Sequence, residues 1–293
     1  MNKHKITFLF IATLILASCS SRKAPESSGK LTVCVSIEPQ RWILEQIGGD
    51  KLNVVSFLPG DANPENFDPP MSALKTASES ALYMRMGHLP WENSLIERIT
   101  ASNPDIRVID TSNGIEPIHG THGHSHPHSH TDDVDPHTWS SVKNARIIAT
   151  NMYEALSESD SSNADYYTER YRALDNKLDS LDKAYTSRLA PLRGASVLVW
   201  HPSLSYYARD YGLNQISIGM ENKETTPIGM QRQLEMAAGR NPIVFFVQPQ
   251  MDGTKSEAVV KHSGAKKFII HPLTYDWWDE MEKITDTLTD STK

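Results

Sequence analysis

Cysteine is scarce in this chain, whose 293 residues contain only Cys19 and Cys34. Two cysteines cannot form a disulfide framework, so the fold must depend on packing. An excess of basic residues is also missing, because 36 acidic side chains outnumber 29 basic ones and give a formal net charge of −7. That charge excludes an electrostatic case for binding nucleic acid. After the N-terminal segment, no apolar run approaches the roughly 18 residues of a membrane-spanning helix.

The N-terminus has the pattern of an export signal rather than of a folded element. Lys3 and Lys5 precede an apolar run over residues 6–17, which is too short to span a bilayer permanently. Small residues then lead into Cys19 in the tetrad Leu-Ala-Ser-Cys. This tetrad resembles the lipobox of bacterial lipoproteins, in which the signal is cut before the cysteine and the cysteine is lipidated. The alternative is an ordinary secretory signal that is cut near Ser18.

Cleavage before the cysteine predicts a signal peptide over residues 1–18 and a polar, serine-rich tether over residues 19–30. Removing the signal takes away two lysines and no acid, which moves the formal charge from −7 to −9. Several acyl chains on one residue anchor a protein stably, whereas a single chain binds only marginally. We therefore expect a periplasmic or cell-surface protein that is lipid-anchored to a bacterial membrane through Cys19.

Alternating strand and helix patterns predict an α/β fold with two lobes. Short β-branched runs at residues 31–37 and 52–58 alternate with helical patterns, which favours mostly parallel sheets flanked by helices. From Tyr167 to Leu189, seven apolar or aromatic residues recur every three or four positions, as on one face of a long helix. We expect an N-terminal lobe, one long rigid linking helix and a C-terminal lobe, over residues 31–160, 161–191 and 192–293.

The most unusual segment, residues 119–130, has the sequence HGTHGHSHPHSH and holds six of the 12 histidines. Neutral imidazole is a good ligand for zinc, copper and nickel, so this composition predicts metal binding. The alternative is a solvated loop without a specific role. Ordering a flexible loop costs entropy, which makes these histidines accessory ligands rather than the main site. They are His119, His122, His124, His126, His128 and His130.

Three further histidines are candidate ligands, and two of them stand beyond the carboxyl ends of strands, where an open α/β sheet places its ligands. His137 lies in the segment Asp-Pro-His-Thr-Trp. His201 follows a predicted strand at residues 196–200, and His271 follows another at residues 268–270. Each alone could be a hydrogen-bonded loop histidine. The spacings are too long for a local motif such as H-E-x-x-H, so only the three together indicate a site.

Several segments together resemble the solute-binding proteins of bacterial zinc and manganese ABC transporters, the cluster A-I family. Besides the histidine-rich loop they are residues 59–70, DPHTW at 135–139, HPSLSYYARDYGL at 201–213 and ENKETTP at 221–227. The resemblance covers essentially the whole mature chain. It implies a monomer without enzymatic activity that captures a metal outside the cytoplasm and delivers it to an ABC permease in the membrane.

The resemblance also implies four protein ligands, one from each of four loops. His137 and His201 match the second and third ligand positions directly. Glu65 stands where the family carries a histidine, and His271 stands where it usually carries an acid. The two departures look reciprocal, so the site would keep three imidazoles and one carboxylate. This set suits zinc in tetrahedral geometry better than manganese or another divalent ion.

Two other functions compete with capture and transport. In a zinc-dependent hydrolase, a zinc-bound water would be the nucleophile and Glu65 would be the general base instead of a ligand. In a surface metal store or adhesin, the histidine-rich loop at residues 119–130 would be the main functional part. Deletion of that loop distinguishes the last possibility from a site built on the strand ends.

Overall fold

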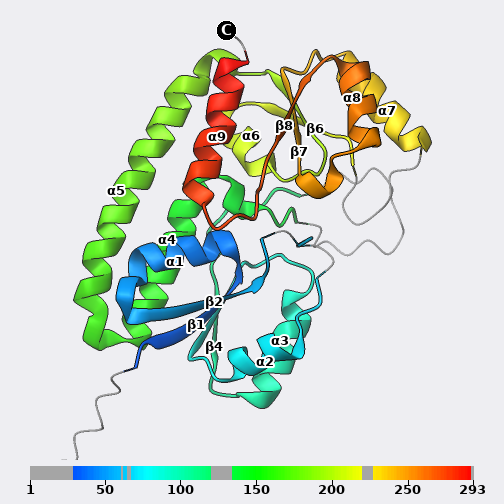
Figure 1. The fold of residues 1–293 in the computed structure, drawn as a ribbon. Coiled ribbons are helices and arrows are strands. Elements are labelled where there is room, and N and C mark those ends of the chain that lie inside the picture. Colours follow the sequence, from blue (N-terminus) through cyan, green and yellow to red (C-terminus); the bar gives the residue numbers. More distant parts are fainter. Residues whose placement is uncertain (1–28, 61, 65–66, 120–133, 220–226, 292–293) are drawn as a thin grey trace, which may run out of the picture.

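The computed structural model describes residues 29–60, 62–64, 67–119, 134–219 and 227–291. These residues form two α/β lobes that are joined along one side by a long helix (Figure 1). Each lobe is built on a four-stranded parallel sheet. None of the helices in these ranges is both long enough and apolar enough to cross a membrane. The predicted fold class, two α/β lobes joined by one long helix, is confirmed.

The first sheet forms from short β-branched runs in the N-terminal lobe. Its strands are β1 (Leu31–Ile37), β2 (Leu52–Leu58), β3 (Leu82–Arg85) and β4 (Arg107–Asp110). All neighbours are parallel, in the order β2-β1-β3-β4. The central strand β1 is buried from Val33 onward, as expected for a parallel strand that is covered on both faces. The helices of this lobe include α1 (Glu38–Gly48), α2 (Met71–Ser78) and α3 (Glu92–Ser102).

The second sheet has the same topology as the first, a likeness that the sequence did not reveal. Its strands are β5 (Ser196–Val199), β6 (Asn214–Ser217), β7 (Val244–Val247) and β8 (Lys266–Ile269). They are parallel, in the order β6-β5-β7-β8. In each lobe the strand order reverses between the first and third strands, and such switch points are where open sheets bind ligands. The helices of this lobe are α6 (Ser205–Tyr211), α7 (Pro227–Ala238), α8 (Thr254–Ser263) and α9 (Trp277–Asp290).

The long helix α5 (Ala164–Leu189) packs beside α4 (Val142–Ser159) and has one buried face. The α-helix itself lies within the expected linking segment, and 3-10 turns at Ser161–Asn163 and Ala190–Leu192 flank it. It contacts α1 in one lobe and α9 in the other, so it ties both lobes together (Figure 1). The predicted apolar face is the observed buried one, with Tyr171 half-buried: Tyr167, Leu174, Leu178, Leu181, Tyr185 and Leu189.

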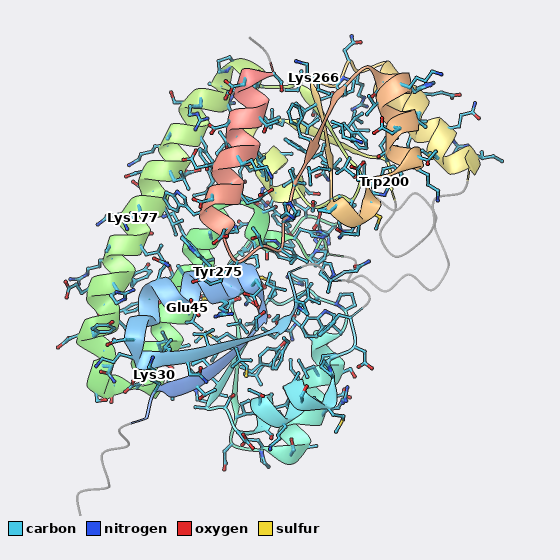
Figure 2. All side chains as sticks on the ribbon, viewed as in Figure 1. Lys30, Glu45, Lys177, Trp200, Lys266 and Tyr275 are labelled. Carbon is cyan, nitrogen blue, oxygen red and sulfur yellow. The ribbon has the colours of Figure 1, made fainter. Side chains whose placement is uncertain are left out.

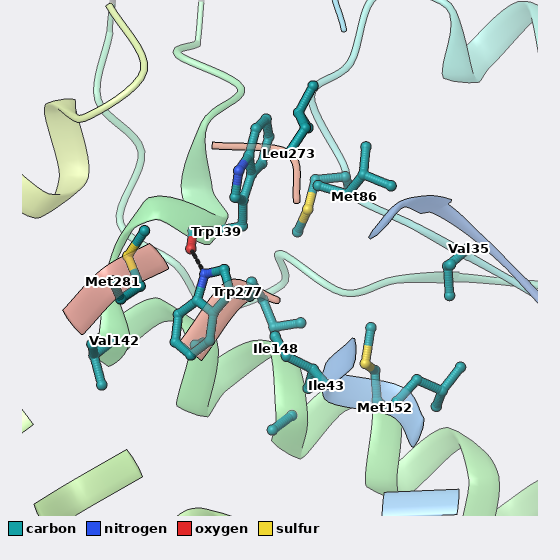
Figure 3. Close-up of a cluster of buried hydrophobic side chains, with 14 of the residues drawn as sticks. Val35, Ile43, Met86, Trp139, Val142, Ile148, Met152, Leu273, Trp277 and Met281 are labelled. Atoms are coloured by element: carbon teal, nitrogen blue, oxygen red, sulfur yellow. Dashed lines mark hydrogen bonds between the residues drawn. The ribbon is translucent and has the colours of Figure 1, made fainter. Parts of the chain in front are cut away.

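Tryptophans join the two lobes below the cleft. The indole N–H of Trp277 donates to the backbone oxygen of Trp139 at 2.8 Å (Figure 3). In turn, the indole N–H of Trp139 donates to the backbone oxygen of Pro272, also at 2.8 Å. At the same seam, the hydroxyl of Tyr275 donates to the Glu45 carboxylate at 2.6 Å (Figure 2). One hydrophobic cluster therefore continues from the first lobe into the second.

Candidate metal-binding site

His137 is held by the aspartate two residues before it. It lies at the start of a 3-10 turn, Thr138–Ser140, and only 1% of its surface is exposed. Its Nδ1 lies 2.8 Å from Oδ1 of Asp135, and its backbone N–H donates to the same oxygen at 2.9 Å. An ionised carboxylate only accepts hydrogen bonds, so Nδ1 carries the hydrogen and Nε2 keeps its lone pair. This is the usual arrangement of a metal-binding imidazole.

The electrostatics favour an ionised Asp135. Burial raises the pKa of Asp135, but the adjacent His137 and the hydrogen bonds to the carboxylate outweigh burial, and the pKa lies below its ordinary value. The backbone oxygen of Asp135 also accepts a hydrogen bond from the Tyr206 hydroxyl at 2.8 Å. That hydroxyl accepts one from the backbone N–H of Ile118 at 3.2 Å. The backbone of Asp135, behind His137, is thus anchored from the second lobe.

His201 brings its outer nitrogen to the same point in space. It follows β5, and its Nε2 lies 2.9 Å from Nε2 of His137. The two rings are 4.8 Å apart between centroids and stand at 75° to each other. Two imidazoles with bonds of about 2.0–2.1 Å to one tetrahedral zinc place their nitrogens about 3.3 Å apart. The observed pair is therefore a small adjustment away from sharing one ion.

His137, His201 and His271 all line one cleft between the lobes, of about 660 Å³. His271 is exposed on its wall, where its backbone N–H donates to the Glu280 carboxylate at 2.7 Å. Within the described ranges, no three or more His, Cys, Asp or Glu side chains are grouped closely enough to hold one metal ion. The structure thus brings His137 and His201 together and leaves His271 on the wall of the same cleft.

The other predicted site residues fall largely outside the described part of the chain. Glu65 is one of them, although its neighbour Pro64 lines the cleft. Cys19 is another, as are the histidines at positions 122, 124, 126, 128 and 130. Of the accessory histidines only His119 is described, and it is exposed. It forms an isolated antiparallel bridge with Val134, which closes the base of the histidine-rich loop.

Sequence reasoning named the segment DPHTW but assigned no role to its first and last residues. Asp135 positions His137, and Trp139 joins the two lobes. The signal for Asp135 was present, because an acid two residues from a ligand histidine can reach its ring. Trp139 offered no local signal, since its partner Pro272 is 133 residues away in the chain.

Comparison with known proteins identifies the family. A model of the family described as "Zinc-uptake complex component A periplasmic" matches residues 33–291. The chain belongs to this family. Its members are periplasmic solute-binding proteins rather than enzymes, which overturns the hydrolase alternative. The chain is accordingly a metal-binding substrate-binding protein of ABC import systems.

Individual relatives agree with this assignment. A crystal structure of ZnuA superposes with a TM-score of 0.81 at 29% identity, covering 90% of this chain and 100% of that one. The zinc-binding lipoprotein AdcA of Streptococcus pneumoniae (strain ATCC BAA-255 / R6) is 24% identical over 93% of this chain, which spans only 56% of AdcA. The manganese ABC transporter substrate-binding lipoprotein PsaA of Streptococcus mitis is 26% identical over 86% of this chain and 83% of its own length.

Proposed function

We propose that this protein captures zinc with high affinity in the cleft between its lobes and delivers it to an ABC-type import permease. His137, His201, His271 and Glu65 are the proposed ligands. One observation carries the proposal: two histidine Nε2 atoms from different lobes lie 2.9 Å apart in the cleft, and an aspartate orients one of them. Two imidazole nitrogens that converge on one point form a metal-binding arrangement. The pair lies in a cleft, whereas a purely structural pair could lie in the core of the protein.

Ligand chemistry supports zinc as the cargo. Three imidazoles and one carboxylate suit zinc, whereas manganese favours carboxylates, carbonyls and water. The family description and the name of AdcA both refer to zinc, while PsaA is named for manganese. The departures at positions 65 and 271 exchange an imidazole for a carboxylate and a carboxylate for an imidazole, so the proposed set keeps the three nitrogen ligands that suit zinc.

Capture requires a local rearrangement rather than a wide opening of the lobes. The tryptophan hydrogen bonds and the continuous core hold the seam beneath the cleft. Helix α5 packs against both lobes and limits how far they can separate. Among the described ligands, the exposed His271 is the one left to close on an ion. Binding thus orders the cleft wall around a His137–His201 pair that is already assembled.

We also propose that the protein acts at the surface of a membrane. Lipidation at Cys19 would hold the protein, as a monomer, on the outer face of a bacterial membrane, within reach of the permease. The histidine-rich loop would concentrate metal near the cleft without being the high-affinity site. The polar tether over residues 19–30 would give the lobes freedom to dock.

A competition titration tests the proposal. Zinc is titrated into mature protein that lacks residues 119–130, in the presence of a chelator of known affinity. We expect tight binding of one zinc ion per chain, and the variant His262→Ala, an exposed histidine outside the cleft, should bind equally well. Loss of all tight binding on loop deletion would favour a surface metal store instead. Manganese measured in the same way should bind more weakly.

A further inference from the structure

Gln248 occupies a central place on the cleft floor. It directly follows β7, the strand that lies between β5 and β8 in the sheet. His201 follows β5 and His271 follows β8, so Gln248 stands between the two histidines at the carboxyl edge of the sheet. The strand order reverses between β5 and β7, which makes this edge the switch point of the second lobe. Gln248 lines the cleft, yet only 6% of its surface is exposed.

The amide of Gln248 is only half satisfied. Its Nε2 donates to Oγ of Ser203 at 3.3 Å, and Ser203 also lines the cleft. Its Oε1 is buried and has no hydrogen-bond donor among the described residues. Leaving a buried carbonyl without a partner costs free energy, so such groups usually serve a ligand, an ion or a water.

The groups around a bound cation determine which hydrogen-bond partner is available to the amide oxygen of Gln248. Imidazoles that ligate a cation have only N–H groups left to offer, and a water on a cation points its hydrogens away from the ion. On the side of Gln248, where His201 and His271 flank the cleft floor, the groups around the ion therefore present donors. An amide oxygen can accept hydrogen bonds from these donors, whereas an amide NH₂ group is itself a donor and would be repelled by them. The contact of Nε2 with Ser203 leaves the oxygen as the end that is available.

We propose that Gln248 is a positioning residue of the metal site, whose Oε1 accepts a hydrogen bond from a water bound to the captured ion. This inference rests on the proposed function, because it requires a metal ion in the cleft. The ion then binds this water in addition to the four proposed protein ligands, so its coordination expands from four to five, with the water on the side of the second sheet. Gln248 gives that water a fixed partner and so helps to set the affinity of the site.

Two substitutions at position 248 separate this role from packing. Gln248→Leu keeps the volume and removes the acceptor, while Gln248→Glu keeps an acceptor oxygen. Gln250 lines the same cleft but is exposed, so Gln250→Leu is the matched control. Zinc affinity is measured for full-length mature chains by chelator competition. We expect a loss of about 10- to 100-fold for Gln248→Leu, the usual effect of removing an outer partner of a metal site. Gln248→Glu should stay within about tenfold of wild type, and Gln250→Leu within about twofold.

A second measurement excludes a purely structural role. Cobalt replaces zinc as a probe, and its visible absorption reports changes in the ligands and water around the ion. Gln248→Leu should alter the cobalt spectrum without lowering the melting temperature of the metal-free protein. Unchanged zinc affinity and an unchanged spectrum in this variant would overturn the inference, as would equal losses in the Leu and Glu variants. The proposed function would survive that result if His201→Ala still abolished tight binding, and would fail only if His201→Ala bound zinc normally.

Discussion

The two walls of the cleft differ in how firmly they hold their histidines. On the first wall, His137 is 1% exposed and its ring is hydrogen-bonded to a buried aspartate. On the second, His271 is exposed, and its backbone N–H donates a hydrogen bond to the Glu280 carboxylate. His201 belongs to the second lobe but reaches the first through its contact with His137. For the proposed metal site, this difference indicates one half that is preformed and one half that is completed on binding.

The largest expected effect comes from removing a preformed ligand. His137→Ala should weaken zinc binding by more than about 100-fold, beyond the usual effect of an outer partner. His271→Ala should cost less, about 10- to 100-fold, because binding must order this exposed side chain and a water can replace it. Chelator competition measures both, with His262→Ala as the control. A larger loss for His271→Ala than for His137→Ala would reverse the comparison between the walls.

The next effect concerns the carboxylate behind His137. Asp135→Asn removes the charge that orients the ring, and we expect zinc affinity to fall about 10- to 100-fold. The exposed Asp105, outside the cleft, provides the control Asp105→Asn, which should bind zinc as wild type does. Isothermal titration of both variants is the measurement. Unchanged affinity in Asp135→Asn would show that packing alone positions His137.

The smallest effect is a dependence on pH. Imidazole must be neutral to bind a metal, and free imidazole titrates near pH 6.5, so protons compete with zinc as the pH falls. We expect zinc affinity to drop by about tenfold or more between pH 7.5 and 5.5. The pKa of Asp135 lies below its ordinary value of 3.8, so this carboxylate stays ionised across the range and does not add to the drop. A dissociation constant that is constant over this range would argue against imidazole ligands.

Much of the fold could be predicted from local patterns in the sequence. The spacing of apolar residues from Tyr167 to Leu189 predicted the buried face of α5, because one helical turn sets which side chains share a side. Strand-end positions predicted His201 and His271, the segment Asp-Pro-His-Thr-Trp added His137, and all three line the observed cleft. Helix α5 itself begins at Ala164, after a 3-10 turn that apolar spacing does not register.

The sequence by itself determined which elements form and which residue types stand at their ends, since periodicity and turn chemistry act over a few residues. Only the tertiary structure decided that two Nε2 atoms from different lobes lie side by side. The same holds for the buried amide of Gln248 and for the indole of Trp139, which reaches across to the second lobe. These features depend on contacts between segments tens to more than a hundred residues apart, and no local pattern encodes the meeting of two distant side chains.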